Sequence, residues 1–400
     1  MARLLVPDDD LFGLHNLPYG VYSTPDRRPR IGVRYGHHVI DLVTLLGDDV
    51  FAAPTLNPFM AEGHGRWVQT RAAIQAALDG EVPDAAVLPV ESVALHRAFD
   101  VADYVDFYAS EHHAANLGRL FRPQSPDPLT PNWRHLPIGY HGRAASIVVS
   151  GTDIVRPSGQ RMEPTQTAPT FGPCARLDIE AELGFVVGAG SPMGTPITAE
   201  RAEEHIFGVV LFNDWSARDI QAWEYVPLGP NLGKSFASTI SPWVVPMLAL
   251  QSAKVATPDQ EPQVLPYLAL DAPWGLDIDL EVSWNGQVVS RPPYAAMYWS
   301  PAQMLAHLTS NGAPTRTGDL FASGTISGPR EDQRGALIEL TWGGSAPITV
   351  AGARRTFLED GDEIVITATA PGANRTRIGF GEARGRVVPS SQGPSDCQED

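Results

Sequence analysis

The chain has 400 residues, which is enough for two domains of ordinary size. It carries 29 basic and 46 acidic residues, and this formal net charge of −17 argues against a nucleic-acid partner, because phosphate binding requires a basic surface. The apolar runs are far too short for a membrane span, and two cysteines cannot build a disulfide framework.

The first hundred residues contain short strand-like segments and one helix-like segment. In the opening MARLLVPDDD, three aspartates follow a short apolar stretch, which therefore does not continue as a signal sequence. We expect a cytoplasmic protein. GVYST (20–24) and IGVRYGHHVIDL (31–42) have strand character, and GRWVQTRAAIQAALDG (65–80) has a helical pattern that ends at Gly80. After residue 98, polar and charged residues are interspersed among apolar ones. We therefore predict a small N-terminal domain, residues 1–98, and a larger domain, residues 99–390.

The larger domain is predicted to be rich in strands, which gives a mixed α+β fold overall. GLDIDLEVSWNGQVVSR (275–291) has the pattern of a hairpin with Asn285-Gly286 at the turn, and SPAQMLAHLTSNGAP predicts a helix that starts at Ser300. Further strands are expected at LIELTWGG (337–344), APITVAG (346–352), DEIVITATA (362–370) and RIGFGEARGRVV (377–388). Residues 391–400 are polar and are predicted to be disordered.

The segment RLDIEAELGFVVG (176–188) is predicted to be a strand with three acids on one face. Asp178, Glu180 and Glu182 alternate with apolar residues, so that like charges would stack in one row. A solvated strand face is one explanation, and for Asp178 we retain it. The apolar end of the strand favours a second explanation for the two glutamates, namely that they project toward one cation.

Another acid follows an apolar strand in VVLFNDWSARDIQAWEYVPLGPNLGKSF (209–236). Asp214 comes directly after the strand, and a buried acid is costly unless it is paired or bound to a metal. Pairing with Arg218 is the structural alternative. GPNLGKS (229–235) is not a phosphate-binding P-loop, because only three residues separate its glycines and Pro230 lacks an amide donor.

A fourth acid lies in DYVDFYASEHHAANLGRLFRP (103–123), where residues 109–121 are predicted to be helical. In the structural alternative, Asp103 or Asp106 caps this helix and its histidines lie on the surface. Four carboxylates without a matching set of Cys and His favour Ca²⁺ or Mg²⁺ over zinc. A divalent ion near His113 would fit metal-assisted attack by water on a carbonyl.

These segments closely resemble the fumarylacetoacetase family of tyrosine and phenylalanine catabolism. The resemblance rests on residues 103–123, 177–185 and 208–236, with LPIGYHGRAASIVVSGT (136–152) and ASGTISGP (322–329), and it spans nearly the whole chain in the family's order. It implies a small SH3-like N-terminal β domain, a larger C-terminal β-roll catalytic domain and a homodimer. The implied activity is metal-dependent hydrolysis of 4-fumarylacetoacetate to fumarate and acetoacetate, without an organic cofactor.

The resemblance also implies roles for individual residues. The metal ligands fall on Asp106, Glu180, Glu182 and Asp214, the general base on His113, and the acid that orients it on Glu339. Arg218, Gln221 and Lys234 are implied to stabilise the oxyanion and the leaving carbanion. Substrate contacts are implied for Tyr108, Arg122, Tyr140, Gln221, Tyr225 and Thr325. A second cation site is implied at Asp214, Lys234 and Ser238, where this chain has Ala237-Ser238 in place of the Gly-Thr of relatives.

The chemistry of a 1,3-diketone suits these groups. Breaking its carbon–carbon bond requires water to attack one carbonyl and a fragment to leave as an enolate-like anion, which a base and positive groups would assist. Arg122 suits a substrate carboxylate, because a guanidinium can hold it by two parallel bonds. Two alternatives remain: a related activity such as acylpyruvate hydrolysis or oxaloacetate decarboxylation, and a cation-stabilised scaffold that binds a ligand without catalysis.

Overall fold

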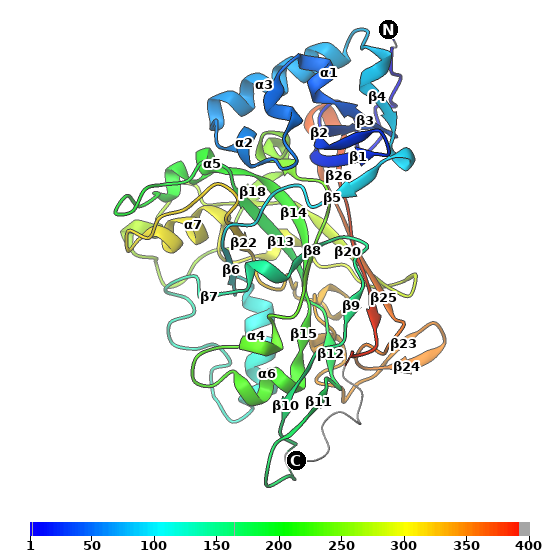
Figure 1. The fold of residues 1–400 in the computed structure, drawn as a ribbon. Coiled ribbons are helices and arrows are strands. Elements are labelled where there is room, and N and C mark those ends of the chain that lie inside the picture. The colour runs from blue at the N-terminus through cyan, green and yellow to red at the C-terminus, as the bar shows by residue number, and fades with distance from the viewer. Residues whose placement is uncertain (2, 164, 392–400) are drawn as a thin grey trace.

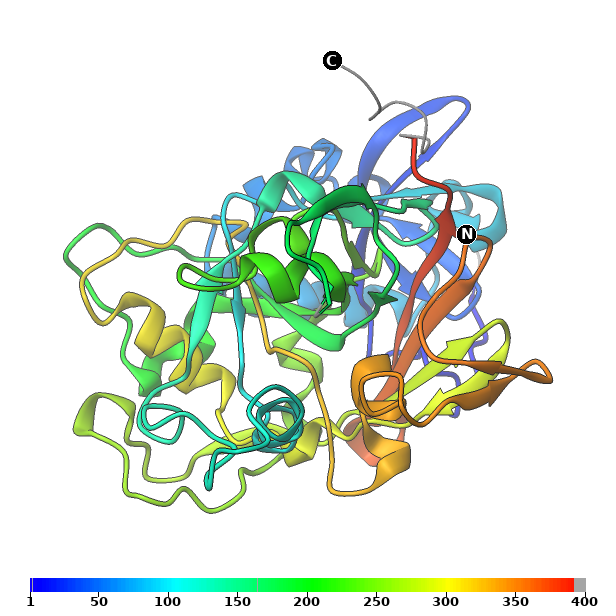
Figure 2. The ribbon, with the colours of Figure 1, turned by 90° about the horizontal axis from the view of Figure 1, so that it is seen from below.

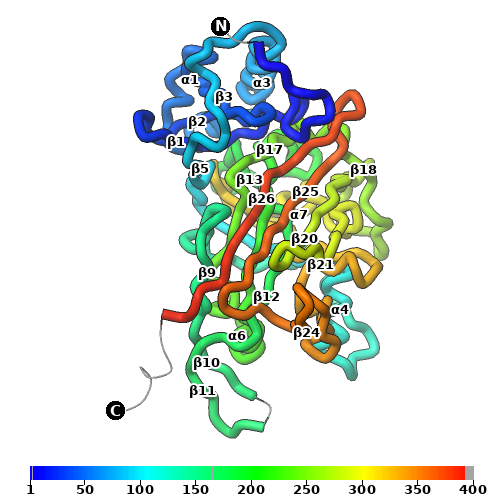
Figure 3. Tube along the Cα trace, turned by 90° about the vertical axis from the view of Figure 1, so that its right-hand side faces the viewer, coloured from blue at the N-terminus to red at the C-terminus, as the bar shows by residue number. Residues whose placement is uncertain are grey.

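The computed structural model describes residues 1, 3–163 and 165–391, so that most of the predicted C-terminal tail lies outside the described residues. It has a smaller N-terminal domain above a larger, strand-rich domain (Figure 1). The orange-to-red C-terminal strands run along one side of the molecule, as the two rotated views show (Figures 2 and 3). The mixed, strand-rich fold class is therefore confirmed. No helix in the described part of the chain is long and apolar enough to cross a membrane.

The N-terminal domain is built on a five-stranded antiparallel sheet. The strands in sheet order are β4 (Val87–Pro89), β3 (His38–Asp41), β2 (Arg27–Tyr35), β1 (Tyr19–Thr24) and β5 (Ala94–His96). The predicted strand at 31–42 is thus two strands, joined at Gly36, whose φ of 56° is one that glycine adopts without strain. The helices are α1 (Leu42–Leu46), α2 (Asn57–Met60) and α3 (His64–Leu78), and α3 confirms the predicted helix at 65–80.

One buried apolar cluster contains residues of both domains. Trp67 of α3 packs edge-on against Phe207 of the larger domain, with ring centroids 5.2 Å apart. β5 ends at His96 and the first strand of the larger domain, β6, begins at Tyr104. The boundary at residue 98 lies between these strands and stays a prediction.

The main sheet of the larger domain has eight strands and carries the predicted acids. In sheet order the strands are β7 (Gly139–His141), β6 (Tyr104–Phe107), β22 (Leu320–Ala322), β13 (Ala181–Val187), β14 (Ile206–Asp214), β16 (Ser238–Ile240) and β8 (Ile147–Val149), with β17 (Val245–Pro246) beside β14. The predicted strand at 176–188 is divided: β12 (Leu177–Asp178) pairs with β15 (Ser216–Ala217), and β13 begins only at Ala181. The break falls at Ile179–Glu180, within the acidic row.

A second sheet of five strands packs against the main sheet through a common apolar core. Its order is β21 (Gln287–Ser290), β20 (Asp279–Trp284), β25 (Glu363–Pro371), β26 (Arg377–Val388) and β9 (Ile154–Val155). The predicted hairpin is confirmed, since Asn285 and Gly286 form the turn with φ values of 50° and 78°. The strands predicted at 362–370 and 377–388 are confirmed as β25 and β26.

The remaining helices and strands surround these sheets. The helices are α4 (Glu111–Phe121), α5 (Ala202–His205), α6 (Arg218–Glu224), α7 (Pro301–Thr309) and α8 (Leu337–Leu340). Three strand pairs are β10 (Ser158–Arg161) with β11 (Thr170–Pro173), β18 (Lys254–Ala256) with β19 (Trp274–Leu276), and β23 (Ile348–Val350) with β24 (Ala353–Arg355). The predicted helix at Ser300 is confirmed as α7, which Ser300 caps together with Gln303.

Three expectations about local structure are wrong. LIELTWGG is not a strand, because Leu337, Ile338 and Glu339 are buried in succession and form the short helix α8. Neither Asp103 nor Asp106 caps α4, since Ser110 does so by accepting a hydrogen bond from the backbone N–H of His113. Asp178 is not on a solvated face but fully buried, because Arg218 and backbone N–H groups surround its carboxylate.

Candidate active site

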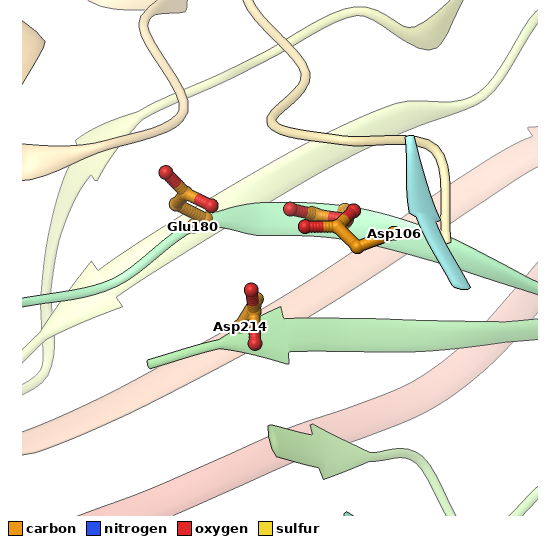
Figure 4. Close-up of side chains that lie close together, drawn as sticks. Asp106, Glu180 and Asp214 are labelled. Carbon is orange, nitrogen blue, oxygen red and sulfur yellow. The ribbon is translucent and has the colours of Figure 1, made fainter. Parts of the chain in front are cut away.

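Four buried carboxylates meet at one end of the main sheet. Asp106 lies in β6, Glu182 in β13 and Asp214 at the last position of β14, while Glu180 immediately precedes β13. One oxygen atom from each lies within 4.8 Å of the others. Figure 4 labels three of them, Asp106, Glu180 and Asp214, whose side chains lie close together although they come from separate segments of the chain. The register of the sheet brings these acids together. Asp106 in β6 and Glu182 in β13 lie on the two strands that pair with β22. The backbone N–H of Asp214 donates to the carbonyl of Glu180 and so joins the other two.

The electrostatics of this cluster favour a cation. Burial raises the pKa of Asp106 well above its usual range, and the Asp214 carboxylate adds to the shift. Burial raises the pKa of Glu182 in the same way, and Asp106 adds to it. Oδ1 of Asp106 and Oε1 of Glu182 are buried without a hydrogen-bond partner. Because unpartnered buried acceptors of this kind are uncommon, the residues present fit a hard divalent cation.

Two cationic side chains, Lys234 and Arg218, contact the carboxylates of the cluster. Lys234 Nζ donates to Glu180 and lies 2.8 Å from Oδ2 of Asp214. Arg218 donates from Nη2 to Oε1 of Glu180 at 2.8 Å. Burial alone would raise the pKa of Glu180, but Lys234 and Arg218 hold that pKa well below its usual range. The structural alternative that paired Asp214 with Arg218 is therefore wrong, since Asp214 pairs with Lys234.

His113 and Glu339 form a buried pair beside the cluster. Nδ1 of His113 lies 2.6 Å from Oε2 of Glu339, and Nε2 lies 3.8 Å from Oε1 of Glu180. The histidine is 2% exposed, so the alternative of a surface residue is wrong for it. Burial alone would raise the pKa of Glu339, but His113 and the other hydrogen-bond donors around the carboxylate hold that pKa below its usual value.

Two residues that the sequence did not single out complete this pair. Asn116 Nδ2 donates to Oε1 of Glu339 at 2.9 Å, and Ser327 Oγ donates to Oε2 at 2.9 Å. The spacing of Asn116 from His113, three positions along a helix, is a signal that could have indicated the asparagine. Ser327 lies in the ASGTISGP segment, where nothing in the pattern distinguishes it.

A cavity of about 590 Å³ opens beside these groups. All six predicted substrate contacts line it, together with His113, Glu180, Arg218 and Lys234: Tyr108, Arg122, Tyr140, Gln221, Tyr225 and Thr325. Its apolar walls were not predicted and include Leu117, Phe121, Ile138, Ala222 and Leu228. Oγ1 of Thr325 is buried without a partner, and Tyr140 donates to Oδ2 of Asp214 at 3.1 Å. The cavity therefore combines a polar end at the carboxylates with an apolar wall.

The three residues expected at a second cation site also lie together. Ser238 Oγ donates to Oδ1 of Asp214 at 2.8 Å, and Lys234 Nζ donates to Oδ2 at 2.8 Å. Each oxygen of Asp214 thus has a donor from the chain itself.

Comparisons with known proteins identify the same family in both domains of the chain. The family model described as fumarylacetoacetate hydrolase C-terminal matches residues 103–388, and the one described as fumarylacetoacetase N-terminal matches residues 15–97. Fumarylacetoacetase from Homo sapiens is 47% identical over 98% of this chain and 99% of the human protein. Those from Caenorhabditis elegans and Arabidopsis thaliana are 44% and 43% identical, each over 96% of this chain and over 98% and 97% of the relative.

A solved structure with the same fold is the fumarylacetoacetate hydrolase from the psychrophile Exiguobacterium antarcticum. Its TM-score is 0.58 at 18% identity, and the match covers 93% of this chain and 99% of that one. Fold and sequence thus agree with the resemblance that the motifs carry: the chain belongs to the fumarylacetoacetase family.

Proposed function

We propose that the chain hydrolyses the carbon–carbon bond of 4-fumarylacetoacetate to give fumarate and acetoacetate, the last step of tyrosine and phenylalanine breakdown. The observation that carries this proposal is the buried His113–Glu339 pair beside the cluster of four buried carboxylates, with His113, Asp106 and Glu180 lining one cavity. The full-length identity of 47% with human fumarylacetoacetase supports it.

Asp106, Glu180, Glu182 and Asp214 would hold the divalent cation, either Ca²⁺ or Mg²⁺. Such an ion supplies Lewis acidity toward the oxygens of a diketone. The unpartnered oxygens of Asp106 and Glu182 support this assignment. Asp214, Lys234 and Ser238 would form the second cation site.

His113 acts as the general base in this proposal. Glu339 accepts the hydrogen from Nδ1, which leaves Nε2 on the cavity side to take a proton from water. The water oxygen bonds to the carbonyl carbon next to the double bond. The tetrahedral adduct then collapses to fumarate, and the bond to the neighbouring CH₂ breaks with its electron pair on the acetoacetate fragment. His113 returns its proton to that carbon, so that one molecule of water is consumed.

Arg218, Gln221 and Lys234 would stabilise the charge that develops in this sequence. Arg218 Nη1 donates to Oε1 of Gln221 at 3.0 Å, which leaves the amide nitrogen of Gln221 free to donate toward the substrate. Arg122 would bind a substrate carboxylate, and Tyr108, Tyr140, Tyr225 and Thr325 would contact the rest of the substrate. The cationic side chains of Arg122, Arg218 and Lys234 matter because the chain as a whole has a net charge of −17 and the substrate is an anion.

We also propose that the chain works as a homodimer in the cytoplasm, on the strength of the full-length family resemblance. Light scattering coupled to size-exclusion chromatography tests the dimer, which should give twice the chain mass of 43.1 kDa.

A substrate comparison tests the proposed activity against its alternatives. The purified protein is mixed with fumarylacetoacetate, an acylpyruvate or oxaloacetate, and the loss of each compound is followed with and without a chelator. We expect fumarylacetoacetate to be the best substrate by kcat/KM. A higher kcat/KM for either other compound would replace the proposed function, and no reaction with any of them would favour a binding scaffold.

A further inference from the structure

The carboxylate of Asp178 is buried outside the cavity, and both of its oxygens accept hydrogen bonds. It is not among the residues that line the cavity, and it is fully buried. Four donors surround it: Nε of Arg218 at 2.8 Å, and the backbone N–H groups of Ile179, Leu337 and Ile338 at 2.7, 2.7 and 3.0 Å. A carboxylate with four short bonds from three separate segments fixes those segments relative to one another.

One of these segments carries the guanidinium that borders the cavity. Arg218 points Nε at Asp178, Nη2 at Glu180 and Nη1 at Gln221. Pairing of β12 with β15 sets this geometry, because Asp178 lies opposite Ser216, two residues before Arg218. Asp178 therefore fixes the Nε edge of the guanidinium, while Gln221 and Glu180 accept from its other two nitrogens.

The second segment carries the partner of the catalytic histidine. Leu337 and Ile338 are the first two residues of α8, and Glu339 is the third. Their N–H groups have no acceptor within this short helix, and the Asp178 carboxylate takes both. The position of Glu339, and through it the direction of His113, thus depends on Asp178.

We infer that Asp178 is a positioning residue that couples the oxyanion-stabilising group Arg218 to the His113–Glu339 base pair. This inference rests on the proposed function. Without the carboxylate, Arg218 loses the acceptor of its Nε hydrogen bond, and α8, which carries Glu339, loses the acceptor of its first two N–H groups.

The test uses Asp178→Asn in the full chain, because the amide keeps the size of the side chain but directs an NH₂ group at donors. We expect kcat to fall by about 10²-fold, the loss typical of one misplaced oxyanion donor, with KM changed little. Asp362→Asn is the matched control. Asp362 is also buried and accepts from an arginine, Arg355, and from a backbone N–H, that of Glu359, but it does not line the cavity. Its variant should keep the wild-type kcat.

Double-mutant cycles separate coupling from a general structural role. If Asp178 acts through both groups, Asp178→Asn should cost less than about tenfold further in kcat when added to Arg218→Lys or to Glu339→Gln. Losses that multiply in both cycles, or a kcat for Asp178→Asn equal to that of Asp362→Asn, would overturn the inference. Should Asp178→Asn fail to fold, Asp178→Glu carries the same cycles, since it keeps the charge and displaces the carboxylate.

A spectroscopic measurement makes the inference testable without turnover. The Nδ1 proton of His113, bonded to Glu339 at 2.6 Å, should give a far-downfield proton resonance in the wild-type protein. Asp178→Asn should shift or broaden it, whereas Asp362→Asn should not. An unshifted resonance contradicts the inference. If the wild type fails to hydrolyse fumarylacetoacetate, the proposed function is wrong, and the resonance still decides the role of Asp178.

Discussion

At the scale of single residues, two adjacent histidines with different surroundings allow the proposed role of His113 to be tested. His113 faces the carboxylate cluster and pairs with Glu339, whereas His112 lines a different surface hollow with Glu111 and Arg334. His113→Ala should lower kcat by about 10²- to 10⁴-fold, the range for loss of a general base. His112→Ala should leave kcat within a few-fold of wild type. Steady-state kinetics on fumarylacetoacetate measure both, and equal losses in the two variants would remove His113 from its assigned role.

Glu182 offers a residue-scale test of cation binding. Its Oε2 accepts from the backbone N–H of Gly324 at 3.0 Å, while Oε1 has no partner and is available to an ion. Glu182→Gln should weaken Ca²⁺ or Mg²⁺ binding at least about tenfold, because even an outer partner of a metal ligand costs that much. Isothermal titration calorimetry gives the affinity. Glu203→Gln, which changes a glutamate paired with Lys254, is the control and should bind as wild type.

Residue chemistry allows much of this site to be predicted. Acids in apolar surroundings require a positive partner, and this requirement, applied to the amino-acid sequence alone, indicates Asp106, Asp214 and the pair Glu180 and Glu182 on one strand face. The role of Asp178 cannot be predicted in this way. Its donors Leu337 and Ile338 lie some 160 residues away, and sequence separation of that size hides contacts made by backbone N–H groups.

At the scale of elements, local sequence patterns predict a helix or strand well where residues within or next to that element decide its conformation. The helix α7 and the hairpin at Asn285-Gly286 follow from capping and turn residues. The prediction of a strand at the short helix α8 failed because an acid from elsewhere in the chain completes the first turn of that helix. A strand pattern in LIELTW could not reveal that tertiary contact.

The capping box of α7 provides a prediction at this scale. Ser300 Oγ accepts from the N–H of Gln303 at 3.1 Å, and Gln303 Oε1 accepts from the N–H of Ser300 at 3.1 Å. Ser300→Ala should lower the free energy of unfolding by about 1 kcal/mol, with kcat unchanged, because α7 does not line the cavity. Ser310→Ala, at the exposed C-terminal end of the same helix, should cost much less. Urea unfolding curves compare the two, and equal midpoints would show that the cap contributes nothing.

At the scale of the whole molecule, stability should depend on pH and on the cation together. Burial and mutual repulsion raise the pKa of Asp106 and Glu182 in the folded state. From about pH 4, where such groups ionise in an unfolded chain, the metal-free folded state therefore binds more protons than the unfolded state. The free energy of unfolding should fall as pH rises from there through the raised pKa values.

A bound cation should offset this trend by stabilising the charged form of the carboxylates. Thermal midpoints measured across pH with a chelator should decline toward neutral pH, and added Ca²⁺ or Mg²⁺ should remove most of the decline. Identical pH profiles with and without the cation would contradict this assignment of the carboxylate cluster.

The most direct test of metal-dependent hydrolysis at this site is a cation titration of activity. The purified protein is freed of metal with a chelator, and Mg²⁺ or Ca²⁺ is added back in steps while hydrolysis of fumarylacetoacetate is followed and fumarate and acetoacetate are measured. We predict no turnover without the ion and a return of activity that follows ion binding, with the two products formed in equal amounts. Full turnover in the metal-free protein, or binding of the ion without recovery of hydrolysis, would contradict the proposed role of the carboxylate cluster.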